Sequence, residues 1–266
     1  MQFIIDIDKL RNAVAKVLPC VSAKPAIPVL NHILFEVKEN LLYLTSTDIN
    51  MSMRTHVSLG DETAVDGALC VSGKYLASIL AKMPSGEVFI FVGSNNVFHL
   101  EQDTIKYDIL GISDLEFPKF LLSEENEYQD IPASDLYRLL NSVLFACSSD
   151  ETRLALGGVY LAKIDDQIIS VSTDGRRLAI VEKNFAWDIK DFEALIPLRT
   201  VSTMLKILKN HDDELLVRLG SYDNHMSLEV RNTVFLSKQI DAKYPNYNQV
   251  VPAEDSYAYE FDLPVQ

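Results

Sequence analysis

Residues 172–179, which read STDGRRLA, contain the side chains best suited to bind another molecule. The adjacent Arg176 and Arg177 bring two guanidinium groups together, and such groups bind anionic and carbonyl-rich partners. The run lies between two apolar segments, 168–172 and 178–181. Because Asp-Gly between such segments is typical of a β-hairpin, we expect the arginines at a hairpin tip. For an arbitrary Asp-Gly, a plain turn without a binding role is the simpler interpretation.

Residues that suit catalysis or metal binding are not grouped in this sequence. The five histidines lack a metal-binding spacing such as HxxxH, and no GxSxG, P-loop or GxGxxG motif occurs. Asp48 and Asp174 occupy similar Thr-Asp turns, and the turn role accounts for both. We therefore expect a non-catalytic protein that requires neither a metal ion nor another cofactor.

Four segments have the apolar spacing of amphipathic helices, namely 9–18, 73–83, 134–147 and 198–210. Asp8 is the expected N-cap of the first helix. The predicted buried positions of the first two helices are Leu10, Ala13, Val14, Val17, Tyr75, Leu76, Ile79 and Leu80. Alternating apolar runs, including 33–37, 41–45, 87–92 and 215–219, predict β-strands between the helices.

The same landmarks recur along the chain at a constant spacing. Leu10 precedes Leu136 by 126 residues, Asp48 precedes Asp174 by 126, and Pro118 precedes Pro245 by 127. A recurring order of this kind indicates an internal repeat. We predict an α+β protein with one module at 1–123 and a second at 124–253, joined through an acidic linker at 124–130. Residues 254–266 resemble the start of a third module, because 257–263 resemble the first strand.

Positive charge is concentrated in the predicted helices although the whole chain carries −14. The four segments carry +3, +2, 0 and +3, which leaves −22 for the remainder. Lysine and arginine are common on the exposed faces of helices, and this explains a single helix well. Across four equivalent helices, the pattern favours a polyanion bound through its phosphates without sequence specificity. The cations concerned are Lys9, Arg11, Lys16, Lys74, Lys82, Arg138, Arg199, Lys206 and Lys209.

The expected location is the cytoplasm. Cys20, Cys70 and Cys147 are far apart and odd in number, which is typical of reduced thiols. The N-terminus has acidic residues and no basic segment of a signal peptide. No apolar run approaches the roughly 18 residues that a membrane span requires.

Several stretches together resemble the bacterial DNA polymerase III β subunit family, the sliding clamps. They are SAKPAIPVL at 22–30, Thr47-Asp48, RLALGGV at 153–159, STDGRRLA at 172–179, Ile196-Pro197 and YPNYNQVVP at 244–252. The resemblance covers the whole chain. It implies tandem DNA-clamp domains, each with two helices packed on antiparallel sheets. It also implies a processivity factor that encircles duplex DNA, with its helices facing the duplex, and tethers the polymerase.

The resemblance further implies a pocket for short linear peptides from the DNA polymerase III catalytic subunit, the clamp loader, other polymerases and repair proteins. Its residues here are Leu156, Thr173, Gly175, Arg176, Arg177, Leu178, Pro245, Gln249 and Val250. The four apolar members suit the floor of such a pocket, and the arginines suit its rim. Family positions that contact DNA correspond to Lys24 and Arg153. This chain departs from the family pattern at Asp150, Leu154 and Ala155.

Family members form a homodimer of three-domain chains, and most of a third domain is missing from this sequence. We therefore expect this bacterial chain to be a monomer that does not close the family's ring. An alternative is a clamp-derived interaction module that binds peptides without encircling DNA.

Overall fold

The computed structural model describes residues 1–25, 27–60, 64–93, 95–120, 127–150, 152–165, 167–184, 190–209, 214–222 and 224–252. The first module contains β1 (Gln2–Asp6), α1 (Ile7–Val17), β2 (His32–Lys38), β3 (Leu41–Thr47), β4 (Met51–Ser58), β5 (Gly67–Ser72), α2 (Gly73–Leu80), β6 (Glu87–Val92), β7 (Val97–Gln102) and β8 (Ile105–Leu110). The second contains β9 (Glu127–Pro132), α3 (Ala133–Leu144), β10 (Gly158–Ile164), β11 (Gln167–Thr173), β12 (Leu178–Asn184), β13 (Phe192–Pro197), α4 (Leu198–Leu208), β14 (Leu216–Tyr222), β15 (His225–Val230) and β16 (Thr233–Lys238). The two lists have the same order, so the predicted repeat is confirmed.

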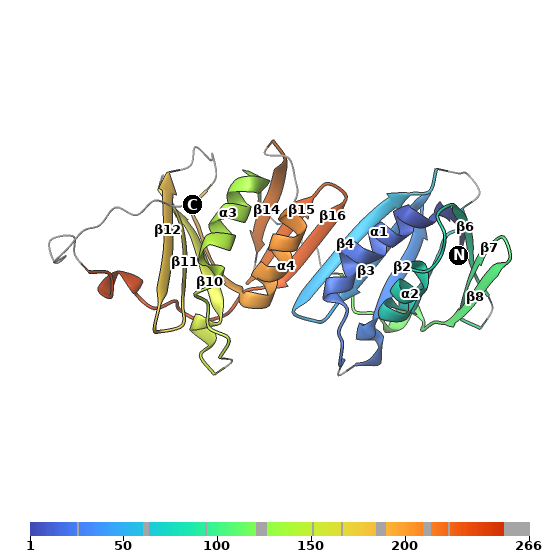
Figure 1. Ribbon diagram of the computed structural model, residues 1–266, viewed down its shortest axis with the longest axis horizontal. Helices are drawn as coiled ribbons and strands as arrows, with labels where there is room; N and C mark the ends of the chain where they lie inside the picture. Colours follow the sequence, from blue (N-terminus) through green and yellow to red (C-terminus); the bar gives the residue numbers. More distant parts are fainter. Residues whose placement is uncertain are drawn as a thin grey trace.

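Antiparallel sheets connect the modules into one body. Each module has one sheet of its own, β1-β6-β7-β8 in the first and β12-β11-β10-β13 in the second. The other two four-stranded halves, β5-β2-β3-β4 and β16-β15-β14-β9, join through β4 and β16 into one eight-stranded sheet. We call the β4–β16 pair the joint. Figure 1 shows the resulting elongated molecule, with β12 near one end and β8 at the other.

The helices pack as their apolar periodicity predicts, with two local corrections. Leu10, Val14 and Val17 of α1 are buried against the sheets. The N-cap of α1 is Asp6 rather than Asp8, because the Asp6 carboxylate accepts hydrogen bonds from the amides of Asp8 and Lys9. Tyr75 is 54% exposed rather than buried, since α2 is short and Leu76, Ile79 and Leu80 already cover the core.

The predicted acidic linker at 124–130 is wrong in its second half. Residues 127–130 belong to β9, whose Tyr128 and Asp130 lie opposite Gly220 and Arg218 of β14. Pairing with β14 determines the structure of this polar segment, although its composition is typical of a linker. The boundaries predicted after residues 123 and 253, and the predicted third module, fall outside the described residues.

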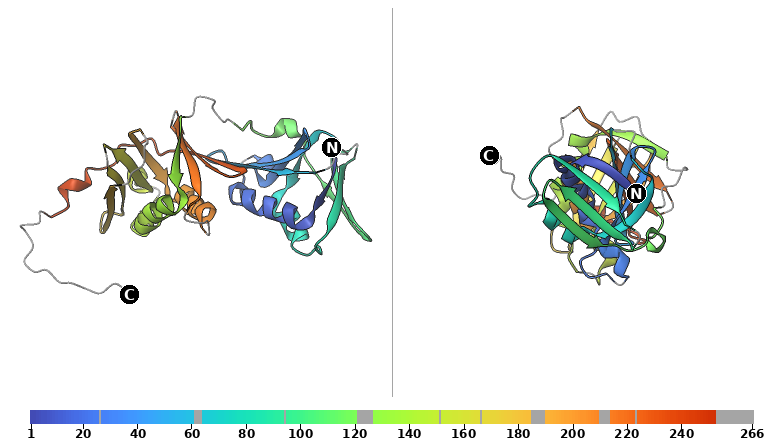
Figure 2. Two further views of the ribbon diagram at one scale, coloured as in Figure 1. Left: turned by 90° about the horizontal axis from the view of Figure 1, so that it is seen from above. Right: turned by 90° about the vertical axis from the view of Figure 1, so that its right-hand side faces the viewer.

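The four helices lie on the same side of the eight-stranded sheet, as Figure 2 (left) shows. Helices α1 and α2 pack together in the first module, and α3 and α4 in the second. In the part of the chain that the structure describes, no helix is long and apolar enough to cross a membrane. The fold thus presents a helical face and, opposite it, a face of strands and connecting segments.

Candidate functional site

A basic groove lies on the helical face where the two modules meet. Its volume is about 860 Å³, and it runs between α1 and α4 beside the joint. Four cationic side chains line it, namely Lys16 of α1, Lys206 of α4, Lys209 just after α4, and Arg231 in the turn between β15 and β16. We call these four residues and the space between them the cationic groove.

The charges of the cationic groove are not neutralised by ion pairs within the described part of the chain. None of its four cations forms an ion pair with a carboxylate among the described residues. Lys16 Nζ instead donates a hydrogen bond to Asn232 Oδ1 at 2.9 Å. Burial lowers the pKa of Lys16, and the positive charge of Arg231 lowers this pKa further. A bound anion would relieve this repulsion, so the groove suits a phosphate-rich ligand.

Arg231 is the functional candidate that sequence reasoning missed. It has a left-handed backbone with φ of 55° at the tip of the β15–β16 hairpin. The other three cations belong to α1, to α4 or to the residue just after α4, whereas this arginine reaches the same groove from a turn. Its position corresponds, through the repeat, to Asp103 in the β7–β8 turn, so no basic residue in the first module indicated it.

The remaining predicted DNA-facing residues fall into two groups. Lys9, Lys24, Lys74, Lys82 and Arg138 are exposed. In contrast, Arg11 is engaged within the first module, where its guanidinium donates to Leu80 O at 3.1 and 3.0 Å and to Met83 O at 3.0 Å and pairs with Asp8. These hydrogen bonds connect α1 to the end of α2.

Two further predicted arginines also have partners. Arg199 forms an ion pair with Asp48 across the joint, and it donates to Pro19 O at 3.4 Å. Arg153 lies 3.6 Å from the Asp150 carboxylate and donates to Asp174 O at 3.3 Å. The prediction that these residues face DNA stays a prediction, but each also has a structural role within the folded chain.

The hairpin tip between β11 and β12 is built around Asp174. Asp174 Oδ1 accepts hydrogen bonds from the amides of Arg176 at 2.9 Å and Arg177 at 3.1 Å. These amides, with a smaller effect of the Arg177 guanidinium, lower the pKa of Asp174. Gly175 has φ of 85°, a conformation that favours glycine. The Asp-Gly turn is therefore confirmed.

The two arginines of the tip differ in their surroundings. Arg177 Nε donates to Asp174 Oδ2 at 3.0 Å, and its guanidinium lies 5.6 Å from the centre of the Phe145 ring. Arg176 is exposed and forms no ion pair with a described carboxylate. Of the pair, Arg176 is thus the one available to a ligand without loss of an internal contact.

The apolar residues of the predicted pocket lie around this tip. Leu156 ends the short helix η4 (Leu154–Leu156), Leu178 begins β12, and both are half-buried. The bond from Arg153 to Asp174 O holds the segment before η4 against the tip. Leu156, Thr173, Gly175, Arg176, Arg177 and Leu178 are therefore grouped at one end of the second module.

The other three predicted pocket residues, Pro245, Gln249 and Val250, belong to the segment that follows β16. They are exposed, and Val250 is 70% exposed. The segment is anchored where Tyr244 stacks on Tyr160 of β10, with ring centres 5.2 Å apart. In η5 (Tyr247–Gln249), burial and then the charge of Glu182 of β12 raise the pKa of Tyr247. Among the described residues, Val250 makes no hydrogen bond or ion pair with the tip.

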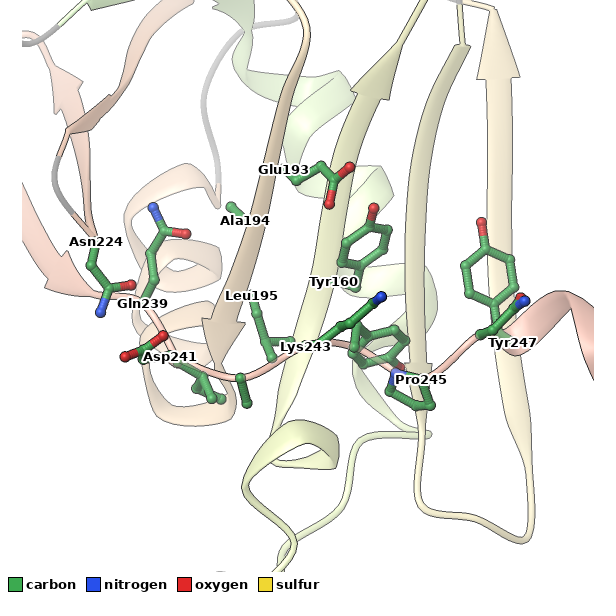
Figure 3. A pocket seen from close by; sticks show the side chains of 14 residues that line it. Tyr160, Glu193, Ala194, Leu195, Asn224, Gln239, Asp241, Lys243, Pro245 and Tyr247 are labelled. Atoms are coloured by element: carbon green, nitrogen blue, oxygen red, sulfur yellow. The ribbon is translucent and has the colours of Figure 1, made fainter.

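A separate cavity of about 510 Å³ opens where segment 239–247 crosses the sheet β12-β11-β10-β13. Figure 3 shows Glu193 and Tyr160 above the part of the segment that carries Lys243 and Pro245. Burial, with Glu193 as the next cause, raises the pKa of Tyr160 to about 12. Of the nine predicted pocket residues, Pro245 alone lines this cavity, so the cavity is distinct from the predicted peptide pocket.

The described residues offer no arrangement for metal or thiol chemistry. No group of three His, Cys, Asp or Glu side chains among them is placed to hold a metal ion. Burial raises the pKa of Cys20 and of Cys70 to about 12 and that of Cys147 to about 11. At neutral pH these thiols are protonated and therefore poor nucleophiles.

Two duplicated α+β modules with a basic helical face define a clamp-type architecture, and comparison with known proteins gives the family. The N-terminal domain model of the DNA polymerase III β subunit matches residues 1–121, and the central domain model matches residues 130–246. The β sliding clamp of Proteus mirabilis is 26% identical over 254 residues, which cover 95% of this chain and 68% of that protein. The Halalkalibacterium halodurans clamp is 28% identical over 264 residues, covering 96% and 69%.

Solved structures agree in fold. The Bacillus subtilis sliding clamp matches with a TM-score of 0.89 and 24% identity, over 96% of this chain and 68% of the other. The Pseudomonas aeruginosa β subunit matches with a TM-score of 0.90 and 24% identity, over 96% and 69%. This chain belongs to the DNA polymerase III β subunit family, the β sliding clamps. It is therefore a non-catalytic protein of DNA replication with a clamp or processivity role, as the resemblance implied.

Proposed function

We propose that this chain holds duplex DNA along its helical face and tethers a replicative polymerase to it. The observation that carries the proposal is the cationic groove, in which four cations without described carboxylate partners line the junction of α1 and α4. Exposed Lys9, Lys74, Lys82 and Arg138 extend positive charge along the helices. Contacts of this type go to phosphates, so the binding has no sequence specificity.

Charge reversal in the groove tests the DNA-facing surface. Lys206→Glu with Arg231→Glu removes two proposed phosphate contacts. We expect the slope of log K against log salt for a duplex to become shallower by about 2, because each phosphate contact contributes about 0.9. The matched control is Lys119→Glu with Lys243→Glu, which makes the same change in net charge at exposed residues that do not line the groove. Equal weakening by both pairs would contradict the proposal.

Encirclement has its own test. A protein that surrounds DNA stays on a circular plasmid and slides off the ends of a linear one. For a form that closes the ring, we expect retention on nicked circular DNA at moderate salt and loss after a single cut by a restriction enzyme. Equal retention on both forms would show that the chain binds DNA from one side alone.

Tethering is proposed to use the pocket at the β11–β12 tip. Leu156 and Leu178 supply half-buried apolar surface there, and exposed Arg176 supplies a donor at the rim. A P. aeruginosa clamp has been solved bound to griselimycin, and a Caulobacter crescentus clamp with PEG bound to a putative β-motif tethering region. A peptide that buries about 400 Å² gains roughly 10 kcal/mol before association costs, which leaves micromolar affinity.

A matched pair of substitutions on η4 tests the pocket. Leu156→Asp places a charge on the proposed floor, whereas Leu154→Asp alters an exposed neighbour two residues away. We expect the first to weaken binding of a polymerase-tail peptide at least tenfold and the second to leave it unchanged. A lower melting temperature for Leu156→Asp would identify Leu156 as a core residue instead.

The alternative function is an interaction module that binds peptides without encircling DNA. The grouping of half-buried Leu156 and Leu178 with exposed Arg176 at the β11–β12 tip favours it, because binding a peptide there requires no closed ring. Peptide binding that is retained together with equal retention on circular and linear DNA would support this alternative.

A further inference from the structure

The cavity beneath segment 239–247 lies on the same sheet face as the proposed peptide pocket. Tyr160 of β10 is paired with Val171 of β11, and Thr173, two residues further along β11, is paired with Leu178 of β12. Paired residues, and alternate residues of one strand, point to the same face of a sheet. The ring of the cavity and the two pocket residues therefore share a face. Two residues of a strand span about 7 Å, so the two sites are neighbours.

This shared face is turned away from the helices. Ser172 lies between the two outward positions of β11, and its hydroxyl donates to Val143 O of α3, so the intervening side chain points toward the helices. On the shared face Tyr244 stacks on Tyr160, with the two rings inclined by 12° (Figure 3). Pro245, which follows Tyr244, lines the cavity and is also a predicted pocket residue. The cavity thus adjoins the proposed pocket through this proline.

The cavity wall combines aromatic rings with carboxylates. Its volume of about 510 Å³ lies within the roughly 300–1,000 Å³ that is usual for ligand pockets. Tyr160, Tyr244 and Tyr247 supply ring surface, and Glu193 and Asp241 supply carboxylates. Both acidic residues are exposed, and neither forms an ion pair with a cation among the described residues.

The charge of this region favours a cationic ligand. Lys243 is the one cation among the lining residues that the structure describes, and it is outnumbered by Glu193 and Asp241. Glu182 of β12 adds a further carboxylate on the same face, because it lies four residues after Leu178. Carboxylates pair with guanidinium and ammonium groups, and the faces of tyrosine rings attract the same cations. The lining therefore suits the side chain of arginine or lysine.

The first module has apolar residues where the second has the polar lining. Strand β10 pairs with β13 as β2 pairs with β5, so positions in the two pairs can be matched. Tyr160 is the third residue of β10, and Leu34 is the third residue of β2. Glu193 is the second residue of β13, and Ala68 is the second residue of β5. Neither the ring nor the carboxylate is required by the strand pairing.

The exit segment of the first module completes this comparison. Phe117 corresponds to Tyr244, because each precedes the proline of its segment, Pro118 or Pro245. Phe117 is 8% exposed and belongs to an apolar cluster that Leu34 contacts and that also contains Val29, Leu30 and Cys70. Apolar packing thus completes this part of the fold in one module. The rings and carboxylates of the other module are available to a ligand.

We propose that the cavity accepts an arginine or lysine side chain of the same peptide whose apolar residues occupy the pocket at the β11–β12 tip. The inference rests on the proposed peptide binding and adds a charge requirement to it. The cation pairs with Glu193 and Asp241, while its aliphatic stem lies against the tyrosine rings. An extended peptide rises about 3.3 Å per residue. We therefore expect the basic residue about two to four positions from the apolar residue that contacts Leu178.

Paired peptides test the charge requirement. Each pair has one polymerase-tail sequence and differs at a single position, about two to four residues before or after the apolar motif. One member carries arginine there, and the other carries citrulline, which has a similar shape but no charge. We expect calorimetric titration to show about fivefold tighter binding of arginine at one of these positions. The ratio should fall toward one at high salt, because exposed ion pairs are screened.

Substitutions in the cavity test whether its carboxylates cause the preference. We expect Glu193→Gln with Asp241→Asn to bring the ratio of the two affinities close to one. The matched control is Glu39→Gln with Glu87→Gln, which makes the same change in net charge at exposed residues of the first module and should keep the native ratio. A cavity variant that keeps the native ratio would overturn the assignment.

The peptide measurements separate this inference from the function on which it rests. If the citrulline peptides bind the native protein and arginine at every position binds equally well, the charge requirement is wrong while the pocket stands. Tighter binding of a glutamate peptide than of its arginine partner would also overturn the inference, because Lys243 would then determine the preference. If no peptide binds, both the proposed tethering and the charge requirement are wrong.

Discussion

The turns at residues 47–51 and 173–177 are two copies of one structure in different surroundings. In each, the threonine hydroxyl accepts a hydrogen bond from the amide two residues later, at 3.1 Å for Thr47 and 3.0 Å for Thr173. In each, the aspartate carboxylate accepts hydrogen bonds from the amides two and three residues later. The distances are 3.1 and 2.8 Å for Asp48, and 2.9 and 3.1 Å for Asp174. The local hydrogen bonds are therefore the same.

The neighbours of the two turns differ. The Asp48 side chain is 6% exposed because the second module covers it and supplies Arg199 as its partner. The Asp174 side chain is 25% exposed and pairs with Arg177 of its own turn. The same motif thus stabilises the joint in one module, while in the other it forms an open tip where we propose that ligands bind.

The largest expected difference concerns the two aspartates. Asp48→Ala leaves two amides and the Arg199 guanidinium without their acceptor in a covered site. We expect a loss of about 3 kcal/mol in the free energy of unfolding, since each bond to a charged group contributes roughly 1.5–3 kcal/mol. Asp174→Ala should cost clearly less, because water replaces its carboxylate at the open tip. Urea denaturation measures both, and equal losses would show that the joint does not distinguish the turns.

The residue after each aspartate gives a smaller effect of opposite sign. Ile49 has φ of 80°, and the equivalent Gly175 has φ of 85°. A left-handed backbone destabilises the folded state by about 1–2 kcal/mol when the residue is β-branched. Replacing that residue by glycine removes this strain, but it also makes the unfolded chain more flexible, which cancels part of the gain in stability. We therefore expect Ile49→Gly to stabilise the protein by about 0.5–1 kcal/mol and Gly175→Ile to destabilise it by a similar or larger amount.

Thermal denaturation of three variants checks this prediction. Gly175→Asn is the matched control, because asparagine tolerates the left-handed region better than isoleucine and should cost less. An Ile49→Gly protein that melts at a lower temperature than the native protein would contradict the prediction. It would show that the contacts of the half-exposed Ile49 side chain stabilise the protein by more than the left-handed backbone destabilises it.

The helical faces and both turns could be predicted because their causes are local. Apolar spacing identified Leu10, Val14 and Val17 as buried, and Asp-Gly identified the hairpin tip. The repeat also relates Ser46 to Ser172, whose hydroxyls donate to Val17 O and Val143 O near the ends of α1 and α3. Contacts that recur in both modules can therefore be predicted in part from the sequence.

The contacts that distinguish the modules could not be predicted in this way. Arg199 pairs with Asp48, 151 residues away, only because β4 and β16 join the modules. Arg231 reaches the cationic groove for the same reason. The peptide-pocket residues came from the resemblance, whereas the internal pairing of Arg177 depends on the folded turn. Long-range pairing of strands determines these contacts, and local patterns do not contain it.

The smallest effect is the acid titration of the open tip. The amides of Arg176 and Arg177, followed by the Arg177 guanidinium, hold the pKa of Asp174 below the ordinary value of 3.8. Since the folded pKa is depressed, the stabilisation from Asp174 is present above the unfolded pKa and is lost as pH falls through the folded pKa. We expect NMR of the Asp174 carboxyl carbon to give a midpoint below that of the same residue in urea. In Arg177→Gln the midpoint should rise only slightly, because the amides remain the main cause. A midpoint in the native protein equal to that in urea would show that the amide bonds at this tip do not hold the carboxylate.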